Sequence, residues 1–590
     1  MIEGRTTKLK IILLALNAKY IHSSLALRSI KAYCKEYEKD MILLEMSINH
    51  NENEILKQVY KYQPNIIGIS CYIWNISLIK QLLPSLKKIL PHTSIILGGP
   101  EVSYQSDYLL EENNIDFIIE GEGEKTWQEY LDYIYKKSIP IVEIQGLVYK
   151  VNDKIVKNKP REALDLSTLP FVYDDISQLD NKIVYYEASR GCPFKCQYCL
   201  SSTDSLVRYM PIDKVLEHMQ YFLNQKVKQV KFVDRTFNAN KNFALEIWKY
   251  LIHNDNGTTN FHFEIAGELL NEEMFVLLKH ARKGLFQFEI GIQSTNPEVL
   301  KRIQRNMPFD KIKAIILKVK ELGTIHQHVD LIAGLPLEDY VSFKNSFNDV
   351  IAIRPEQLQL GFLKLLKGSG LRRDAKKYGI VYKEEAPYEV LFTHVLSYDE
   401  LLRLHGIEEM LERYYNSGRF MNTLEYLFNQ FSSEFDFFEE LWCYWENNHY
   451  DEVQHNKIFY YSKLVEFSDR IPNINKVFIR ELLRLDLFLH EYVKDIPNEL
   501  RTIEQSLYKQ KSHQLLNDEE YLKDVSQGLY MLDIRHRLRK AHIEYFNYDV
   551  YAYMQSKHEK PIKDNDEKIA LLFDYSAEDV LCSRVEEHYL

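Results

Sequence analysis

Three closely spaced cysteines are the feature of this sequence with the clearest chemistry. Cys192, Cys196 and Cys199 stand in the segment Ala188-Ser-Arg-Gly-Cys-Pro-Phe-Lys-Cys-Gln-Tyr-Cys199, a C-x3-C-x2-C spacing. Thiolates are soft ligands that suit zinc or an iron–sulfur cluster. A structural zinc site normally takes a fourth Cys or His at short range, whereas the next candidate, His218, lies inside a helical pattern. The spacing therefore favours a four-iron cluster with one iron left open for a small molecule.

The other cysteines do not enlarge this group. The chain has seven cysteines, and the remaining four are Cys34, Cys71, Cys443 and Cys582. An odd number with one tight group does not resemble a disulfide framework. Cys443 and Cys582 are too far apart in the sequence to suggest a second cluster. We expect one cluster per chain.

Composition bounds the kinds of partner. A chain of 590 residues predicts three or four domains of about 150 residues each. The net charge of −11 and the pI near 6.0 give no general attraction to nucleic acid. The longest apolar run near the start, 11–16, is too short for a signal peptide or a membrane span. We expect a cytoplasmic protein with neither nucleic-acid nor membrane partners.

The first part of the chain alternates short apolar runs with amphipathic segments. The predicted strands are 10–16, 41–46, 65–71, 94–97 and 117–120. Helical spacing between them predicts an α/β domain over 8–140, with a parallel, doubly wound, Rossmann-like sheet. Ligands of such sheets bind beyond the carboxyl ends of the strands. Four glycines follow the last two of these strands: Gly98, Gly99, Gly121 and Gly123.

A second alternating series follows a linker with a small hairpin, which we place at 141–180. Its predicted strands are 183–188, 229–234, 261–266, 286–292, 328–333 and 358–363. Six strand-then-helix units predict a partial (β/α)6 barrel of the TIM type over 181–372, with the cysteines after its first strand. In 373–590 glycine and strand alternation become rare and aromatic residues become denser. We expect a mainly helical domain whose aromatic residues pack its interior or form a wall over the barrel mouth.

The cysteine segment resembles the motif of the radical S-adenosylmethionine (SAM) enzymes, in which an aromatic residue, here Tyr198, precedes the last cysteine. The resemblance covers roughly 181–375 and includes the strand count and the place of the motif. It implies a 4Fe–4S cluster held by Cys192, Cys196 and Cys199, whose open iron chelates the amino and carboxylate groups of SAM. It also implies a one-electron reductant of the flavodoxin or ferredoxin type, and cleavage of SAM to a 5′-deoxyadenosyl radical.

The same resemblance points to polar residues at the ends of the later strands as contacts to the SAM ribose and ammonium. These candidates are Asp234, Asn238, Glu268, Gln293 and Asp330. Glu289 joins this set unless it faces outward, and Gly334 would let the backbone approach the adenine. The alternative for each acid is that it caps the helix after its strand.

The phrases ILGGPEVS and IIEGEGE resemble those of the cobalamin-binding domains that precede many radical SAM enzymes. Glycines there would let the backbone lie against a flat corrin ring. A dinucleotide site is disfavoured because no G-x-G-x-x-G follows the first strand. The remaining alternative is a domain that binds nothing.

The usual D-x-H-x-x-G signature of histidine-ligated cobalamin is missing. His22, in the first strand-to-helix loop, either coordinates cobalt from below or caps the helix and contacts the corrin edge. Cys71 and Tyr72, at the end of the third strand, are further candidates for lining the lower face of the ring.

The three-part layout resembles the DUF4080 type of cobalamin-binding radical SAM protein. This implies an enzyme that methylates an unactivated carbon or phosphorus centre of an unidentified small molecule or peptide. One alternative is an oxidative cyclisation or rearrangement, as in anaerobic magnesium-protoporphyrin ester cyclases, and another is a non-catalytic cobalamin or redox sensor. Methylthiotransferases of tRNA are disfavoured because their first domain holds a cluster on three cysteines, whereas only Cys34 and Cys71 lie in this one.

Overall fold

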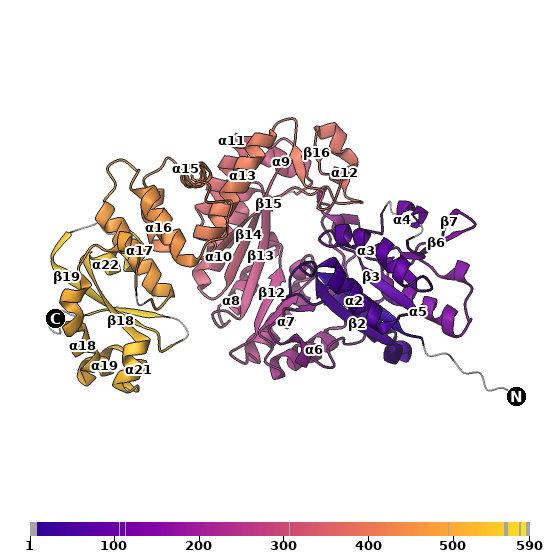
Figure 1. Ribbon diagram of the computed structural model, residues 1–590, viewed down its shortest axis with the longest axis horizontal. Helices are drawn as coiled ribbons and strands as arrows, with labels where there is room; N and C mark the ends of the chain where they lie inside the picture. Colours follow the sequence, from indigo (N-terminus) through magenta and orange to yellow (C-terminus); the bar gives the residue numbers. More distant parts are fainter. Residues whose placement is uncertain are drawn as a thin grey trace. The chain divides into compact units, whose positions relative to one another are not determined.

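The computed structural model divides the chain into two compact units, Met1–Pro355 with Leu360–Leu401, and Glu356–Gln359 with Leu402–Leu590 (Figure 1). The residues that the structure describes are 9–104, 107–112, 114–203, 205–305, 307–493, 495–559, 564–577 and 580–585. Within these ranges no helix is both long enough and apolar enough to cross a bilayer.

The first unit begins with a seven-stranded sheet in the order β2-β1-β3-β4-β5-β6-β7. Its five parallel strands are β1 (Ile11–Asn17), β2 (Met41–Ser47), β3 (Ile66–Ser70), β4 (Ser94–Gly98) and β5 (Phe117–Ile119). The hairpin predicted in the linker is β6 (Leu147–Val151) and β7 (Lys154–Lys157), and it pairs antiparallel with β5. The predicted hairpin is therefore present, and it covers the otherwise open edge of the first sheet.

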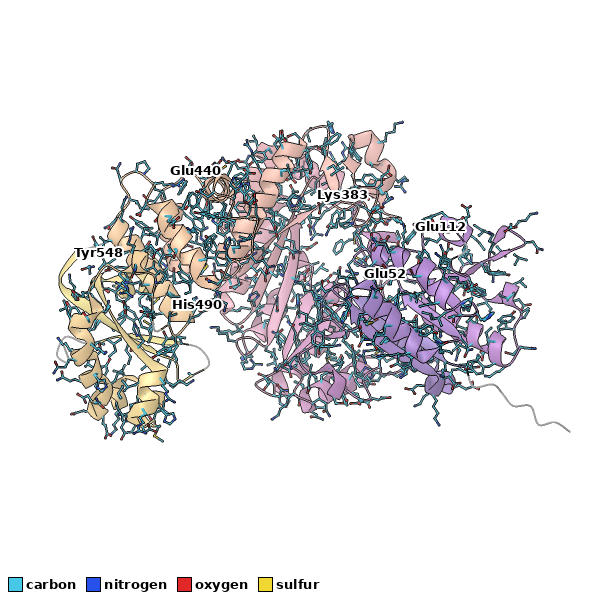
Figure 2. The ribbon with its side chains drawn as sticks, in the orientation of Figure 1. Glu52, Glu112, Lys383, Glu440, His490 and Tyr548 are labelled. Carbon is cyan, nitrogen blue, oxygen red and sulfur yellow. The ribbon has the colours of Figure 1, made fainter. Side chains whose placement is uncertain are left out.

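Helices cover both faces of this sheet because successive strand residues point in opposite directions. Ile12 and Leu14 face α2 (Glu52–Tyr62) and α3 (Ile76–Ile89), whereas Ile11 and Leu13 face α1 (Leu25–Tyr33) and α5 (Gly123–Tyr135). Asn51 caps α2 by accepting a hydrogen bond from Glu54 N at 2.9 Å, and Glu52, labelled in Figure 2, lies in the acidic first turn. The doubly wound prediction is confirmed.

The second sheet has six strands in the order β15-β14-β13-β12-β11-β8. They are β8 (Val184–Tyr186), β11 (Gln229–Phe232), β12 (Asn260–Glu264), β13 (Phe286–Gln293), β14 (His326–Ala333) and β15 (Gln357–Phe362). The helices between them are α6 (Ile212–Asn224), α7 (Lys241–His253), α8 (Glu272–Leu278), α9 (Pro297–Arg302), α10 (Phe309–Leu322) and α11 (Tyr340–Ile351). The pairs from β8 to β14 are parallel, as the predicted partial barrel requires.

The two faces of this second sheet differ in polarity. Phe263 and Phe288 lie against Trp248 of α7, with ring centroids 6.1 and 5.3 Å from it. The intervening side chains of His262, Glu264 and Glu289 therefore point to the face opposite the helices. A short ribbon of β9 (Ser189–Arg190) and β10 (Arg208–Tyr209) flanks the start of the cysteine loop.

The second unit is mainly helical, as expected. Its helices include α14 (Met421–Phe428), α15 (Glu434–Asn447), α16 (Lys457–Ser468) and α17 (Lys476–His490). It also contains a three-stranded antiparallel sheet that the sequence analysis missed, namely β18 (Ala541–Tyr548), β19 (Asp564–Asp574) and β20 (Leu581–Arg584). Strand β18 was not predicted because four consecutive residues, 543–546, are buried, so the strand lacks the period-two alternation of apolar and polar residues.

Candidate functional site

The cysteine loop is held from both sides by backbone hydrogen bonds. Gln197 N donates to Ile303 O at 2.9 Å, and Leu371 N donates to Gln197 O at 2.9 Å. Cys192 and Cys196 are buried, Cys199 is half-buried, and all three are free thiols. The loop is thus anchored between segments that follow strands far apart in the sequence.

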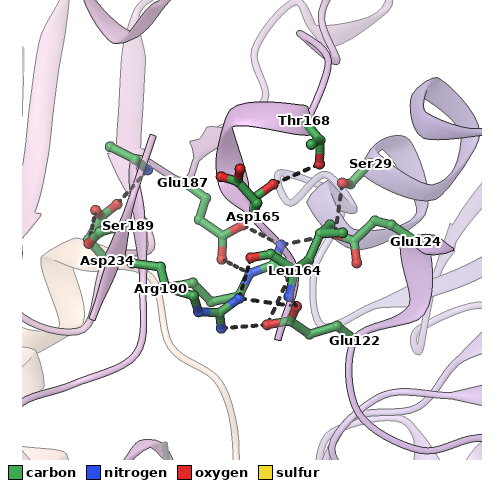
Figure 3. A network of polar contacts seen from close by, with 12 residues as sticks. Ser29, Glu122, Glu124, Leu164, Asp165, Thr168, Glu187, Ser189, Arg190 and Asp234 are labelled. Carbon is green, nitrogen blue, oxygen red and sulfur yellow. Dashed lines mark hydrogen bonds and ion pairs between the residues drawn. The ribbon is translucent and has the colours of Figure 1, made fainter. Parts of the chain in front are cut away.

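Two of the predicted SAM contacts, Asp234 and Asn238, have hydrogen-bond partners within the protein. Asp234 is fully buried and accepts hydrogen bonds from Ser189 Oγ at 2.5 Å and Ala188 N at 3.0 Å (Figure 3). Burial raises its pKa to about 7. Asn238 exchanges two hydrogen bonds with the backbone of Ala266, at 2.8 and 2.9 Å. The structure assigns both side chains to holding the loops around the cysteines.

Glu268 and Gln293 gather with a residue that the sequence analysis missed, Arg305. The Arg305 Nη1 lies 3.4 Å from the Tyr198 hydroxyl and 3.9 Å from Cys196 Sγ, and its Nη2 donates to Gly291 O. Burial alone would lower the pKa of Arg305, but Tyr198, Cys196 and Glu268 raise it. A lone arginine after a helix is usually solvated, so no sequence pattern singled it out.

Three buried atoms in this group lack a hydrogen-bond partner among the described residues: Arg305 Nε, Gln293 Oε1 and Glu268 Oε2. Unpaired buried polar atoms are costly and call for a ligand. A guanidinium, an amide and a carboxylate supply both donors and acceptors, which suits the zwitterionic end of SAM beside an iron cluster. The residues present therefore fit both groups.

The thiols are not arranged for a single ion. Within the described ranges, no three His, Cys, Asp or Glu side chains converge on one metal-ion position. In a 4Fe–4S cube each thiolate binds a different iron, so the thiols need not converge on one point.

The remaining strand-end candidates lie in other surroundings. Glu289 faces the polar side of the sheet, where Lys231 Nζ and His262 Nε2 each lie 3.0 Å from its Oε2. Burial works to raise its pKa, yet the His262 hydrogen bond and the Lys231 charge bring it down to about 2. Asp330 lies on the same side, with its Oδ1 3.3 Å from His328 Nε2, and burial followed by the Glu289 charge raises its pKa. These residues form a charged cluster on the face of the sheet opposite the helices.

Gly334 has a close neighbour of its own. Its φ is +87°, and a Cβ built there would lie 2.7 Å from Val390 Cγ1. The close approach that this glycine permits is to Val390 of β17 (Val390–Phe392).

A cavity of about 660 Å³ is lined by residues at the carboxyl ends of strands in the first sheet. Residues at or just after β8 and β11 of the second sheet complete its wall. Its wall includes the four predicted glycines, Gly98, Gly99, Gly121 and Gly123, and also His22 and Tyr72. Cys71 lies instead in the core on the α2–α3 side, fully buried, with its Sγ 3.7 Å from Ile69 O. The structure therefore does not place Cys71 against the cavity.

Glycine is required at two points of this wall. Gly99 has φ +110°, and a Cβ there would lie 2.6 Å from Cys71 O. At Gly68 a Cβ would meet the Trp127 ring at 2.5 Å. The cavity reaches past these residues to Leu13 and Ile30, in the layer between the sheet and α1. Such a cradle with a deep apolar extension fits a large, flat group with an appendage, as in cobalamin.

His22 reaches across to the first strand of the second sheet. Its Nδ1 lies 2.6 Å from the Tyr185 hydroxyl, and burial lowers its pKa. Tyr72 and Trp74 stack at 4.4 Å between ring centroids and 5° between planes, also at the cavity wall. Aromatic and imidazole side chains thus line the cavity together with the glycines.

Family models match three parts of the chain. The B12 binding domain matches residues 11–131, the radical SAM superfamily matches 186–350, and the protein of unknown function DUF4080 matches 376–573. The chain contains a B12 binding domain, a radical SAM domain and a DUF4080 region. Its radical SAM domain implies a 4Fe–4S cluster and SAM, and its B12 binding domain implies cobalamin, as the sequence resemblance predicted.

The curated relatives that match this chain are distant. It is 26% identical to an uncharacterized methyltransferase of Pyrococcus horikoshii, over 48% of the chain and 64% of that protein. It is 23% identical to the cobalamin-dependent radical SAM methyltransferase TokK of Streptomyces tokunonensis, over 54% of the chain and 50% of that protein. It is 24% identical to the anaerobic magnesium-protoporphyrin IX monomethyl ester cyclase of a Synechocystis strain, over 48% and 58%. Less than two thirds of each relative is covered.

Solved structures share the fold. The cobalamin-dependent SAM radical enzyme OxsB aligns with a TM-score of 0.54 at 15% identity, covering 95% of this chain and 82% of that one. The radical SAM methyltransferase TsrM of Kitasatospora setae aligns with a TM-score of 0.53 at 15% identity, covering 64% and 79%. The radical SAM and B12-binding domains therefore occur in a known order and fold.

Proposed function

We propose that this protein is a cobalamin-dependent radical SAM enzyme that methylates an unactivated carbon or phosphorus centre. The observation that supports it most is the shared wall of the two sites. The cavity that contains the predicted glycines is also lined by Ser189, Arg190 and Gly191, which directly precede Cys192. A corrin in the cavity and a cluster on the cysteines would lie on either side of these three residues.

The chain's residues would hold the groups as follows. Cys192, Cys196 and Cys199 bind three irons, and Arg305 binds the carboxylate of SAM. Glu268 binds the SAM ammonium, and its Oε2 is the buried unpaired atom described above. When bound, the cluster with SAM supplies a 5′-deoxyadenosyl radical and cobalamin supplies a methyl group. The protein's part is to position these groups and to keep water away from them.

Among the relatives, methyltransferases outnumber the cyclases, and this favours methyl transfer over oxidative ring formation. For the one-electron donor we propose a protein of the flavodoxin or ferredoxin type.

Product analysis tests the proposal. Anaerobically reconstituted protein is incubated with cobalamin, a reductant, methyl-deuterated SAM and a small-molecule extract of the source cells. Methyl transfer predicts a product that gains one deuterated methyl group, absent when Cys199→Ala protein is used. A product that has lost hydrogens without gaining a methyl group would establish cyclisation or rearrangement instead. Cobalamin binding without any cleavage of SAM would indicate a sensor.

A further inference from the structure

Arg190 lies between the two proposed sites and binds carboxylates on the cobalamin side. Its Nη2 lies 2.9 Å from Glu124 Oε1 and 2.7 Å from Glu187 Oε2, and its Nη1 lies 3.4 Å from Glu122 Oε1 (Figure 3). Burial would lower the pKa of this guanidinium, but Glu187, Glu124 and Glu122 raise it. Three carboxylates thus hold one charged side chain in place.

Glu122 and Glu124 flank Gly123 in the cavity wall. Glu124 also accepts a hydrogen bond from Ser29 Oγ at 3.0 Å, which ties the loop to α1. Glu122 accepts from Arg208 Nη2 at 2.6 Å and from Leu164 N at 2.8 Å. Arg208 pairs with Arg190 in the β9–β10 ribbon. Two arginines of one ribbon therefore hold two carboxylates of the glycine loop.

The connection from Arg190 to the cysteines is short and constrained. Gly191 separates Arg190 from Cys192, has φ +105°, and has no room for a Cβ, which would lie 2.3 Å from Leu206 O. On the other side, Ser189 is bound to Asp234. A shift of Glu122 and Glu124 would therefore move the start of the cysteine loop.

We propose that Arg190 is a positioning residue that couples cobalamin binding to loading of the iron–sulfur cluster. The inference rests on the proposed function and adds an interaction between its two cofactors. A corrin against the 121–124 loop fixes Glu122 and Glu124, these fix Arg190, and Arg190 fixes the backbone that carries Cys192. Because coupling between two binding equilibria is reciprocal, a loaded cluster must then tighten cobalamin binding by the same factor.

Titration with hydroxocobalamin measures this coupling without turnover. The dissociation constant is determined by absorbance for protein with a reconstituted cluster and for iron-free protein. For the unmodified chain we expect binding to be at least about 5-fold tighter with the cluster, within the usual range of such couplings. In Arg190→Gln the ratio should fall to about one, while the variant still binds iron and hydroxocobalamin. Arg190→Lys keeps the charge but not the bidentate geometry, and should retain part of the ratio.

Arg161→Gln is the matched control. Arg161 is also buried and ion-paired, to Glu129, and donates to Thr126 Oγ1 at 2.7 Å. The Arg161 side chain donates its hydrogen bonds to Thr126, Glu129 and Gln145, which lie outside both the 121–124 loop and the cysteine loop, so the cluster-dependent ratio should be unchanged. Glu124→Gln tests the same contact from the other side if Arg190→Gln does not fold, and it too should lower the ratio.

A ratio of one in the unmodified chain would overturn the coupling and leave the proposed function intact. A cluster-dependent ratio that is undiminished in both Arg190→Gln and Glu124→Gln would also overturn the proposed role of Arg190. Failure of the unmodified chain to bind hydroxocobalamin, with or without cluster, would instead overturn the proposed function.

Discussion

Ser189 Oγ donates a hydrogen bond of 2.5 Å to Asp234 Oδ1, and the two residues belong to segments that follow neighbouring strands, β8 and β11. The Asp234 side chain has no exposed surface, and its second oxygen accepts from Ala188 N. This one carboxyl holds the backbone that leads into the cysteine loop, and it makes the loop sensitive to pH.

The free energy of unfolding should therefore contain a contribution from Asp234 that declines with rising pH. The folded-state pKa of about 7 exceeds the ordinary 3.8, so between these values the native state binds more protons than the unfolded state. Stability then falls by up to about 1.4 kcal/mol per pH unit and levels off above pH 7. Asp234→Asn does not titrate, so urea unfolding between pH 5 and 8 should show a smaller decline. Asp213→Asn, at an exposed site on α6, should decline like the unmodified chain; equal slopes in all three proteins would contradict the assignment.

Arg305→Gln should weaken SAM binding while the cluster is still assembled. The guanidinium is buried beside Cys196 and Tyr198, and charge-assisted hydrogen bonds to a carboxylate contribute about 1.5–3 kcal/mol. We expect the affinity for SAM, followed by the change that SAM causes in the electron paramagnetic resonance of the reduced cluster, to fall about 10-fold or more. Arg302→Gln removes an exposed arginine from the same helix end and should bind SAM normally. Equal SAM affinities in the two variants would refute this role.

Ala26→Phe should block cobalamin. Ala26 lies on α1 and lines the cavity, so a phenyl group there takes up space that the corrin needs without changing the helix backbone. Hydroxocobalamin affinity should fall about 10-fold or more, a loss of about 1.4 kcal/mol or more. Ala26→Ser alters polarity but adds little volume, and it should bind within a few-fold of the unmodified protein. Tight binding by Ala26→Phe would place the cofactor elsewhere.

Arg484→Met should destabilise the second unit far more than Arg480→Met, one turn earlier on α17. Arg484 is fully buried and its Nη1 donates to Glu544 Oε1 at 2.8 Å. Its loss removes the guanidinium from this buried carboxylate, which keeps its contacts with Gln505 and His542. Removing one partner of a buried pair costs about 3–5 kcal/mol. Arg480 pairs with the partly exposed Asp469, and such a pair contributes about 0–1 kcal/mol. Thermal unfolding measures both variants, and similar midpoints would show that the buried network adds no stability.

Much of the fold was predictable because strands buried on both faces show as short apolar runs. The runs 11–16 and 66–69 are apolar throughout, and this predicted the first sheet. The pairing of the hairpin β6–β7 with β5 was not predictable, because it depends on the free edge of a sheet and not on the hairpin's own residues. The sheet around β18 was missed for a related reason, because its residues are buried by long-range packing against α17.

At the site, the cysteines and glycines were predictable because backbone and ligand chemistry leave few other residues possible there. The hydrogen-bond partners of single polar side chains at the site were not predictable. Asp234 and Asn238 carry the expected residue types, yet they bind Ser189 and Ala266, partners that only the fold brings near. Arg305 shows the converse, since its importance comes from burial beside Cys196 and Tyr198, which spacing along the chain does not express.

The most direct test of the central claim is the amount of 5′-deoxyadenosine that anaerobically reconstituted protein forms from SAM with dithionite as the reductant. We expect about four irons per chain, formation of 5′-deoxyadenosine, and its loss in Cys192→Ala, Cys196→Ala and Cys199→Ala. Protein that carries four irons on these cysteines and forms no 5′-deoxyadenosine would contradict the account, as would formation that persists in Cys196→Ala.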